Sequence, residues 1–149
     1  MKDSYRVVVI GGGVVGASVL YHLAKFGWTD VCLLERSVLT AGSSWHAAGG
    51  IHALNADPNI AALQAYTIDL LPEIEKESGQ DIGLHMTGGL TMAGTPDRWG
   101  WLQSAYRVFQ SIGIEDVHLI TPEEAGALCP VMSTHGILGG MWAEREGYV

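Results

Sequence analysis

The sequence predicts an α/β fold: the first part of a Rossmann-type dinucleotide-binding sheet, followed by a mixed α+β region. Two observations support this. A β-branched strand runs into a glycine-rich turn and a helix, and after residue 55 no further strand-helix-strand unit follows. We therefore divide the 149 residues into a dinucleotide-binding half with its adjoining loop, 1–55, and helices with the first strands of a second region, 56–149. The predicted sheet is incomplete, because a doubly wound sheet needs more than two parallel strands. We expect the chain to be the front portion of a larger protein.

The first strand, turn and helix have the order that a dinucleotide fingerprint requires. Residues Arg6–Ile10 form a β-branched run suited to a buried parallel strand, and Val14–Phe26 are predicted to be helical. Gly11 makes the tight turn, Gly13 lets backbone N–H groups approach a pyrophosphate, and Gly16 lets the helix lie close to the strand. The alternative is a glycine-rich turn in an unrelated α/β protein, which the strand, the helix and the following acid together disfavour.

The acid after the second strand indicates which nucleotide is bound. Val31–Leu34 is an apolar strand, and Glu35 follows it, nineteen positions after Gly16. A carboxylate there accepts hydrogen bonds from ribose hydroxyls and repels a 2′-phosphate, so NADP is disfavoured. The helix N-terminus, at Val14 and Val15, presents unpaired N–H groups and a partial positive charge of about half an electron to the phosphates.

Composition excludes several classes of partner. Sixteen acidic and eight basic residues give a formal charge of −8, which argues against nucleic acid and anionic membrane surfaces. No apolar run reaches the roughly 18 residues of a membrane span. The N-terminus enters a strand at once, so we expect no signal peptide and a cytoplasmic location. Cys32 and Cys129 form no CxxC pair, and we interpret them as buried, reduced thiols.

The second region alternates helices and strands without parallel repeats. Thr121 and Glu124 form a predicted capping box, and Trp99, Leu102 and Phe109 belong to an apolar stripe that we interpret as core. The patterns predict these elements in order: a helix after Pro58 bent at Pro72, a strand over Gly88–Ala93, a helix from Pro96 ending near Gly113, a strand over Asp116–Ile120, a helix after Thr121 and a strand over Ile137–Trp142.

The loop Gly42–Gly50 consists of small residues around Trp45 and His46. Small residues permit close backbone approach, and Ser43 or Ser44 is placed to cap a short helix directed at phosphate. His46 is a candidate nucleophile or ligand; the alternative is a hydrogen-bonded loop histidine. The other histidines form no metal-ligand cluster, so we assign no metal and interpret them as structural or solvent-facing: His22, His52, His85, His118 and His135.

Three motifs resemble the FAD-dependent amine oxidoreductases of the D-amino-acid-oxidase superfamily, particularly dimethylglycine and sarcosine dehydrogenases. They are Gly11–Gly16, Leu34–Arg36 and above all Leu39–Gly49. Weaker similarity continues along the whole chain. The resemblance implies the N-terminal part of a Rossmann-type FAD-binding domain, glutathione-reductase-like, joined to the start of a mixed α+β substrate domain.

The resemblance also implies a cofactor site. In the family, the histidine of the Trp-His pair is joined covalently to the flavin 8α-methyl group, and His46 occupies the matching place; noncovalent FAD is the alternative. Catalytic groups are not expected within these residues. The positions expected to contact FAD are Gly11, Gly13, Val14, Val15, Gly16, Glu35, Arg36, Gly42, Ser43, Ser44, Trp45, His46, Ala47, Ala48 and Gly49.

The function that the resemblance implies is oxidation of an N-methylated amino acid such as dimethylglycine or sarcosine, with hydride passing to the flavin. An electron-transfer flavoprotein or oxygen would accept the electrons, and folate would be a partner only where a C-terminal region exists. Two alternatives stay open. One is an amino-acid oxidase or deaminase with noncovalent FAD, and the other is a truncated, non-catalytic nucleotide-binding fragment.

Overall fold

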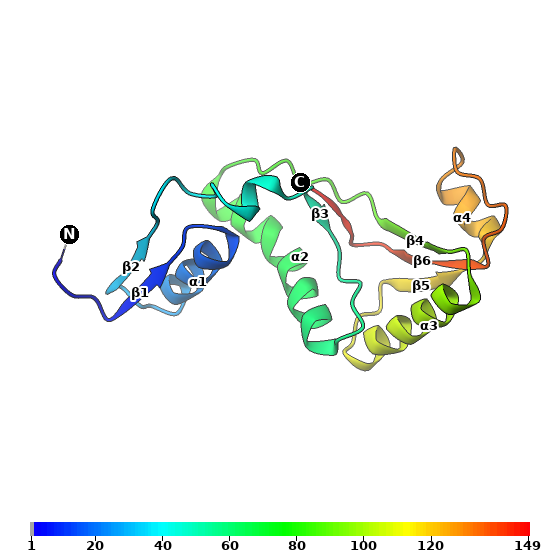
Figure 1. The fold of residues 1–149 in the computed structure, drawn as a ribbon, viewed down its shortest axis with the longest axis horizontal. Helices are drawn as coiled ribbons and strands as arrows, with labels where there is room; N and C mark the ends of the chain where they lie inside the picture. The colour runs from blue at the N-terminus through cyan, green and yellow to red at the C-terminus, as the bar shows by residue number, and fades with distance from the viewer. Residues whose placement is uncertain (1) are drawn as a thin grey trace. The chain divides into compact units, whose positions relative to one another are not determined.

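The computed structural model describes residues 2–149, which form two compact units (Figure 1). The first unit ends at Ala48 and the second covers Gly49–Val149. The boundary lies within the small-residue loop, seven residues earlier than the division expected after residue 55.

The first unit is a βαβ arrangement. Its elements are β1 (Val7–Ile10), α1 (Val14–Lys25), β2 (Val31–Leu34) and the short 3₁₀ helix η1 (Ser43–His46). Strands β1 and β2 pair in parallel, as predicted, with each residue of β1 opposite the residue 24 positions later in β2. Helix α1 begins at the predicted residue and ends one residue earlier than predicted.

Part of the first unit's apolar surface is uncovered. Ile10 is 86% exposed, Val8 is 44% exposed, and α1 contains no fully buried residue. Branched apolar residues of this kind suit a strand that is covered on both faces. Two strands and one helix leave these side chains in solvent, which agrees with the prediction of an incomplete sheet.

The second unit holds a three-stranded antiparallel sheet, with strand order β4-β6-β5, and a two-residue antiparallel pair, β3-β7. The elements are β3 (Gly50–Ile51), α2 (Pro58–Ser78), β4 (Gly89–Ala93), α3 (Pro96–Ser111), β5 (Val117–Ile120), α4 (Pro122–Leu128), β6 (Gly139–Ala143) and β7 (Gly147–Tyr148). No parallel pair occurs among the described residues after Ala48. β3 and β7 were not predicted, because two-residue strands carry no readable periodicity.

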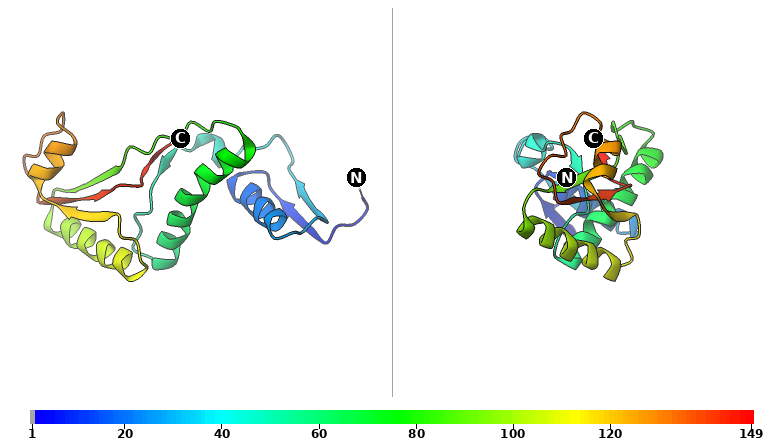
Figure 2. Two further views of the ribbon diagram at one scale, coloured as in Figure 1. Left: turned by 180° about the vertical axis from the view of Figure 1, so that it is seen from behind. Right: turned by 90° about the vertical axis from the view of Figure 1, so that its right-hand side faces the viewer.

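The core of the second unit lies between α3 and the sheet (Figures 1 and 2). Leu102 and Phe109 of the predicted stripe are completely buried, and Val117 and Met141 join them from the sheet. Trp99 packs at the edge of this cluster. The glycine at the start of β6 makes this possible, because a Cβ at Gly139 would approach the Trp99 ring to 2.8 Å.

The start of α4 follows the predicted side-chain chemistry, and α2 has a cap that was not predicted. Thr121 Oγ1 accepts the Glu124 N–H and the Glu124 carboxylate accepts the Thr121 N–H, which completes the capping box. Asp57 caps α2 by accepting two backbone N–H groups. Pro72 does not divide α2, which is one 21-residue helix. Both cysteines are unpaired as predicted but only half-buried, which corrects the expectation of buried thiols.

Candidate cofactor site

The turn after β1 explains two of the three predicted fingerprint glycines. Gly11 has φ +107°, a conformation that side chains other than glycine rarely adopt, and its N–H donates to the Leu34 carbonyl at 2.8 Å. A Cβ at Gly16 would overlap the Gly11 carbonyl oxygen and contact Val9 at 3.5 Å. Helix α1 therefore lies against the turn at Gly16, as the sequence predicted.

Gly12 is a position that the sequence analysis left unassigned. It is the one buried residue of the turn, and its N–H donates to Glu35 Oε2 at 2.7 Å. A Cβ there would meet Leu39 Cδ2 at 2.6 Å and Glu35 Cβ at 3.1 Å. The uninterrupted Gly11–Gly13 triplet was the signal for this second close approach, between the turn and the segment that follows β2.

Glu35 uses its carboxylate to join two backbone segments. Oε2 accepts the Gly12 N–H, and Oε1 accepts the Ser37 N–H at 2.9 Å. These bonds, first the one from Gly12 and then the one from Ser37, hold the pKa of Glu35 below its usual value, with a smaller contribution from Arg36. Each carboxylate oxygen has two lone pairs. The ionised group therefore retains acceptor capacity for ribose hydroxyls.

The N-terminus of α1 presents backbone donors. Gly13 precedes the helix, and the first intrahelical bond runs from the Ala17 N–H to the Gly13 carbonyl at 2.9 Å. The N–H groups of Val14, Val15 and Gly16 therefore have no carbonyl partner within the helix.

One of these three N–H groups is already paired within the protein, because the Val14 N–H donates to Ser44 Oγ at 2.8 Å. The prediction that Ser43 or Ser44 caps a short helix was wrong, since η1 begins after Gly42 without a side-chain cap. Ser44 caps α1 instead, across 30 positions of sequence. The Val15 and Gly16 N–H groups keep no carbonyl partner within the helix.

The loop before η1 is held by backbone bonds around Thr40. Thr40 has φ +66°, donates its N–H to the Gly12 carbonyl at 2.9 Å and accepts the Trp45 N–H at 3.1 Å. The Trp45 side chain is 78% exposed. Thr40 was not predicted as a site residue, because a threonine with positive φ has no sequence signature.

His46 has a defined tautomer in this arrangement. Its Nδ1 lies 3.0 Å from the Gly42 carbonyl oxygen. A carbonyl oxygen only accepts hydrogen bonds, so in the neutral ring Nδ1 carries the proton and Nε2 carries the lone pair. The imidazole is exposed to solvent.

The remaining predicted positions lie around this loop. Arg36, Ala47 and Ala48 are exposed. Gly49 lies in the second unit, where its φ is +81° and its carbonyl accepts the Val149 N–H at 3.0 Å. Residues 2–149 contain no group of three or more metal-ligating side chains. No helix of the same residues is long and apolar enough to span a membrane.

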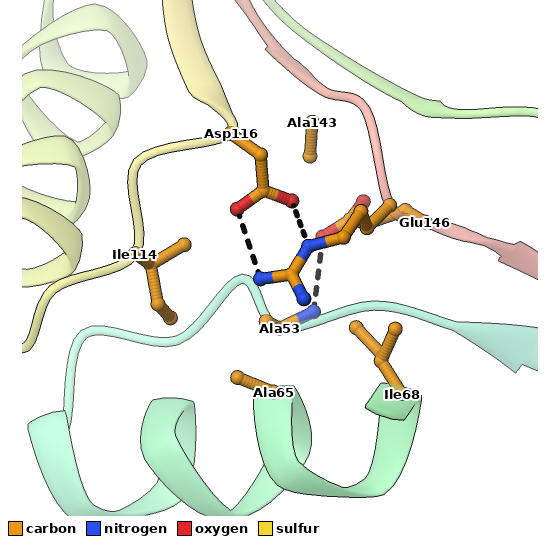
Figure 3. A pocket seen from close by; sticks show the side chains of 8 residues that line it. Ala53, Ala65, Ile68, Ile114, Asp116, Ala143 and Glu146 are labelled. Atoms are coloured by element: carbon orange, nitrogen blue, oxygen red, sulfur yellow. Dashed lines mark hydrogen bonds and ion pairs between the residues drawn. The ribbon is translucent and has the colours of Figure 1, made fainter. Parts of the chain in front are cut away.

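A second feature, which the sequence analysis missed, is a buried acid beside a groove in the second unit. The groove, of about 420 Å³, is lined by β3, the start of β4 and the N-terminal part of α3, and Arg98 lies over Trp101 within it at 4.3 Å. Glu146, labelled in Figure 3, is 8% exposed and lines the same groove. The sequence analysis missed Glu146 because an acid between Arg145 and Gly147 belongs to no periodic apolar pattern that would indicate burial.

Known proteins resemble this chain over nearly its whole length. The FAD dependent oxidoreductase family matches residues 6–149. Rat mitochondrial dimethylglycine dehydrogenase is 38% identical over 99% of the chain, and human mitochondrial sarcosine dehydrogenase is 35% identical over 99%. The chain spans only 17% and 16% of the length of these relatives. The crystal structure of Geobacillus kaustophilus glycine oxidase superposes with a TM-score of 0.76, at 29% identity, over 97% of this chain and 40% of that one. The chain belongs to the FAD dependent oxidoreductase family.

Proposed function

We propose that the chain supplies the dinucleotide-binding half and the flavin loop of an amine dehydrogenase that oxidises an N-methylated amino acid. The observation that carries the proposal is the joined arrangement of fingerprint and loop. Ser44 bonds the first N–H of α1, and His46 lies two residues later with its Nε2 lone pair available. The similarity to dimethylglycine and sarcosine dehydrogenases supports the substrate class.

The residues of the first unit fit FAD. Gly16 brings the α1 N-terminus against the turn, which leaves the Val15 and Gly16 N–H groups as donors to the pyrophosphate. Glu35, ionised and anchored by Gly12, offers its remaining lone pairs to ribose hydroxyls. When bound, FAD supplies the hydride acceptor of the reaction.

His46 Nε2 is the proposed point of covalent attachment. The Gly42 carbonyl holds Nδ1 protonated and fixes the ring, so the nucleophilic nitrogen is defined before the cofactor is attached. In the alternative, FAD is bound noncovalently and only contacts the loop, without a bond to His46.

Acid precipitation tests the attachment. The protein is expressed with its flavin, denatured and precipitated in acid, and the flavin absorbance of pellet and supernatant is measured. We expect the yellow colour in the pellet for wild type and in the supernatant for His46→Ala. His135→Ala is the matched control, because its exposed imidazole is in the second unit, far along the chain. Flavin released completely from wild type would contradict covalent attachment.

Anaerobic flavin bleaching tests the substrate class separately. We expect dimethylglycine or sarcosine to bleach the flavin absorbance and a primary amino acid to leave it unchanged. Bleaching by a primary amino acid but not by dimethylglycine or sarcosine would favour the alternative hypothesis, an amino-acid oxidase or deaminase. Protein that acquires no flavin at all would favour the non-catalytic fragment.

The electron acceptor and the cellular location of the protein are also proposals. An electron-transfer flavoprotein or oxygen is the proposed electron acceptor. The cytoplasmic location stays a prediction, and both relatives named above are mitochondrial proteins by name.

A further inference from the structure

The segment 39–46, which ends in η1, is held against the glycine turn and α1 at two places. Near its start, the Thr40 N–H donates to the Gly12 carbonyl at 2.9 Å. Near its end, Ser44 Oγ accepts the Val14 N–H at 2.8 Å. All of these residues belong to the first unit. The two hydrogen bonds therefore fix both ends of the segment within one compact unit.

Gly13 makes room for the second of these bonds. A Cβ at Gly13 would lie 3.1 Å from Ser44 Oγ, a separation that few Cβ contacts in proteins reach. Ser44 is half-buried, whereas its neighbours Ser43 and Trp45 are exposed. The fingerprint position that the sequence assigns to the pyrophosphate therefore also accommodates a hydroxyl group of the protein.

Further bonds within the segment connect Ser44 to its surroundings up to His46. The Trp45 N–H donates to the Thr40 carbonyl at 3.1 Å. His46 Nδ1 lies 3.0 Å from the Gly42 carbonyl oxygen. Donors and acceptors of both bonds lie in the same segment, so these bonds fix its internal shape and not its position on α1. The bond between Ser44 and α1 supplies that position.

We propose that Ser44 is a positioning residue: by accepting the Val14 N–H it holds η1 on the N-terminus of α1 and so sets where His46 lies. Groups that react with each other must be held in a defined geometry, and a misplacement of about 1 Å can cost about 100-fold in rate. The consequence for flavin attachment at His46 rests on the proposed function, whereas the attachment of η1 to α1 does not.

Hydrogen exchange of the flavin-free 149-residue protein tests the attachment of η1 to α1. We expect Ser44→Ala to lower the protection of the Val14 amide about fivefold, the factor that corresponds to the loss of one capping bond. The Trp45 amide keeps its own acceptor in this variant, but it should also lose protection, because η1 is no longer held at its end. Loss of protection at Val14 alone would mean that Ser44 only caps α1, and would overturn the proposal.

Two further variants control this measurement. Ser44→Thr keeps the hydroxyl group and should restore the protection of the Trp45 amide toward the wild-type value. Ser18→Ala is the matched control, because it removes an exposed hydroxyl group from α1 one turn further along and should leave the Trp45 amide unchanged. An equal loss at Trp45 in Ser18→Ala and Ser44→Ala would overturn the proposal.

A time course of acid precipitation measures the consequence for His46. Flavin-free protein is mixed with FAD, samples are precipitated in acid at intervals, and the flavin absorbance of the pellet is followed. We expect Ser44→Ala to retain flavin at least about tenfold more slowly than wild type, because the reacting groups are no longer held in place. Equal rates would overturn the positioning role. Wild type that retains no flavin would contradict the proposed function instead, and the exchange of the Trp45 amide would then decide on Ser44 alone.

Discussion

Replacing Leu102 by alanine tests the core of the Gly49–Val149 unit. Leu102 lies on α3, is completely buried and belongs to the same core cluster as Phe109. The substitution removes three carbon groups, a transfer loss of about 2.4 kcal/mol at about 0.8 kcal/mol each. The cavity that remains adds up to about 2.5 kcal/mol. We therefore expect the free energy of unfolding to fall by about 2.5–5 kcal/mol.

Urea denaturation followed by tryptophan fluorescence measures this loss. With a slope of about 1.5 kcal/mol per molar urea, the midpoint should fall by at least about 1.5 M. Leu63→Ala is the matched control: it makes the same chemical change on α2, where the side chain is 61% exposed, and should stay within about 0.5 kcal/mol of wild type. Equal losses for the two variants would refute the assignment of the core to α3 and the sheet.

Three further changes test the cofactor site, a helix cap and an ion pair. Gly16→Ala forces a Cβ into the Gly11 carbonyl, so purified protein should lose its flavin absorbance; full retention would contradict the close approach. Thr121→Ala removes the cap of α4 and should cost about 1 kcal/mol by urea titration, whereas Thr121→Ser should be close to wild type. Arg145 holds the pKa of Asp116 below its usual value, so this contribution exists above about pH 4 and is lost as the pH falls. Arg145→Gln should therefore cost at most about 1 kcal/mol at pH 7, and the difference from wild type should shrink in acid; a difference that grows in acid would contradict it.

Local chemistry is what made much of the fold predictable. The β1-α1-β2 order follows from β-branched runs around a glycine turn, and α4 begins where a threonine and a glutamate stand three residues apart. These signals act between neighbours in sequence, so they can be read without knowing the fold. The error at Ser44 has the opposite cause, because its partner, the Val14 N–H, lies 30 positions away.

The sequence by itself determined the dinucleotide fingerprint, the capping box of α4, and the choice of His46 as the candidate attachment residue. Tertiary structure alone decided that Ser44 caps α1, because the Val14 N–H that it accepts lies 30 positions earlier. It also decided that Glu146 is buried, since its burial depends on Ala53, 93 positions earlier. A residue's type and its near neighbours specify local conformation, whereas solvent access and hydrogen-bond partners depend on segments that only folding brings together.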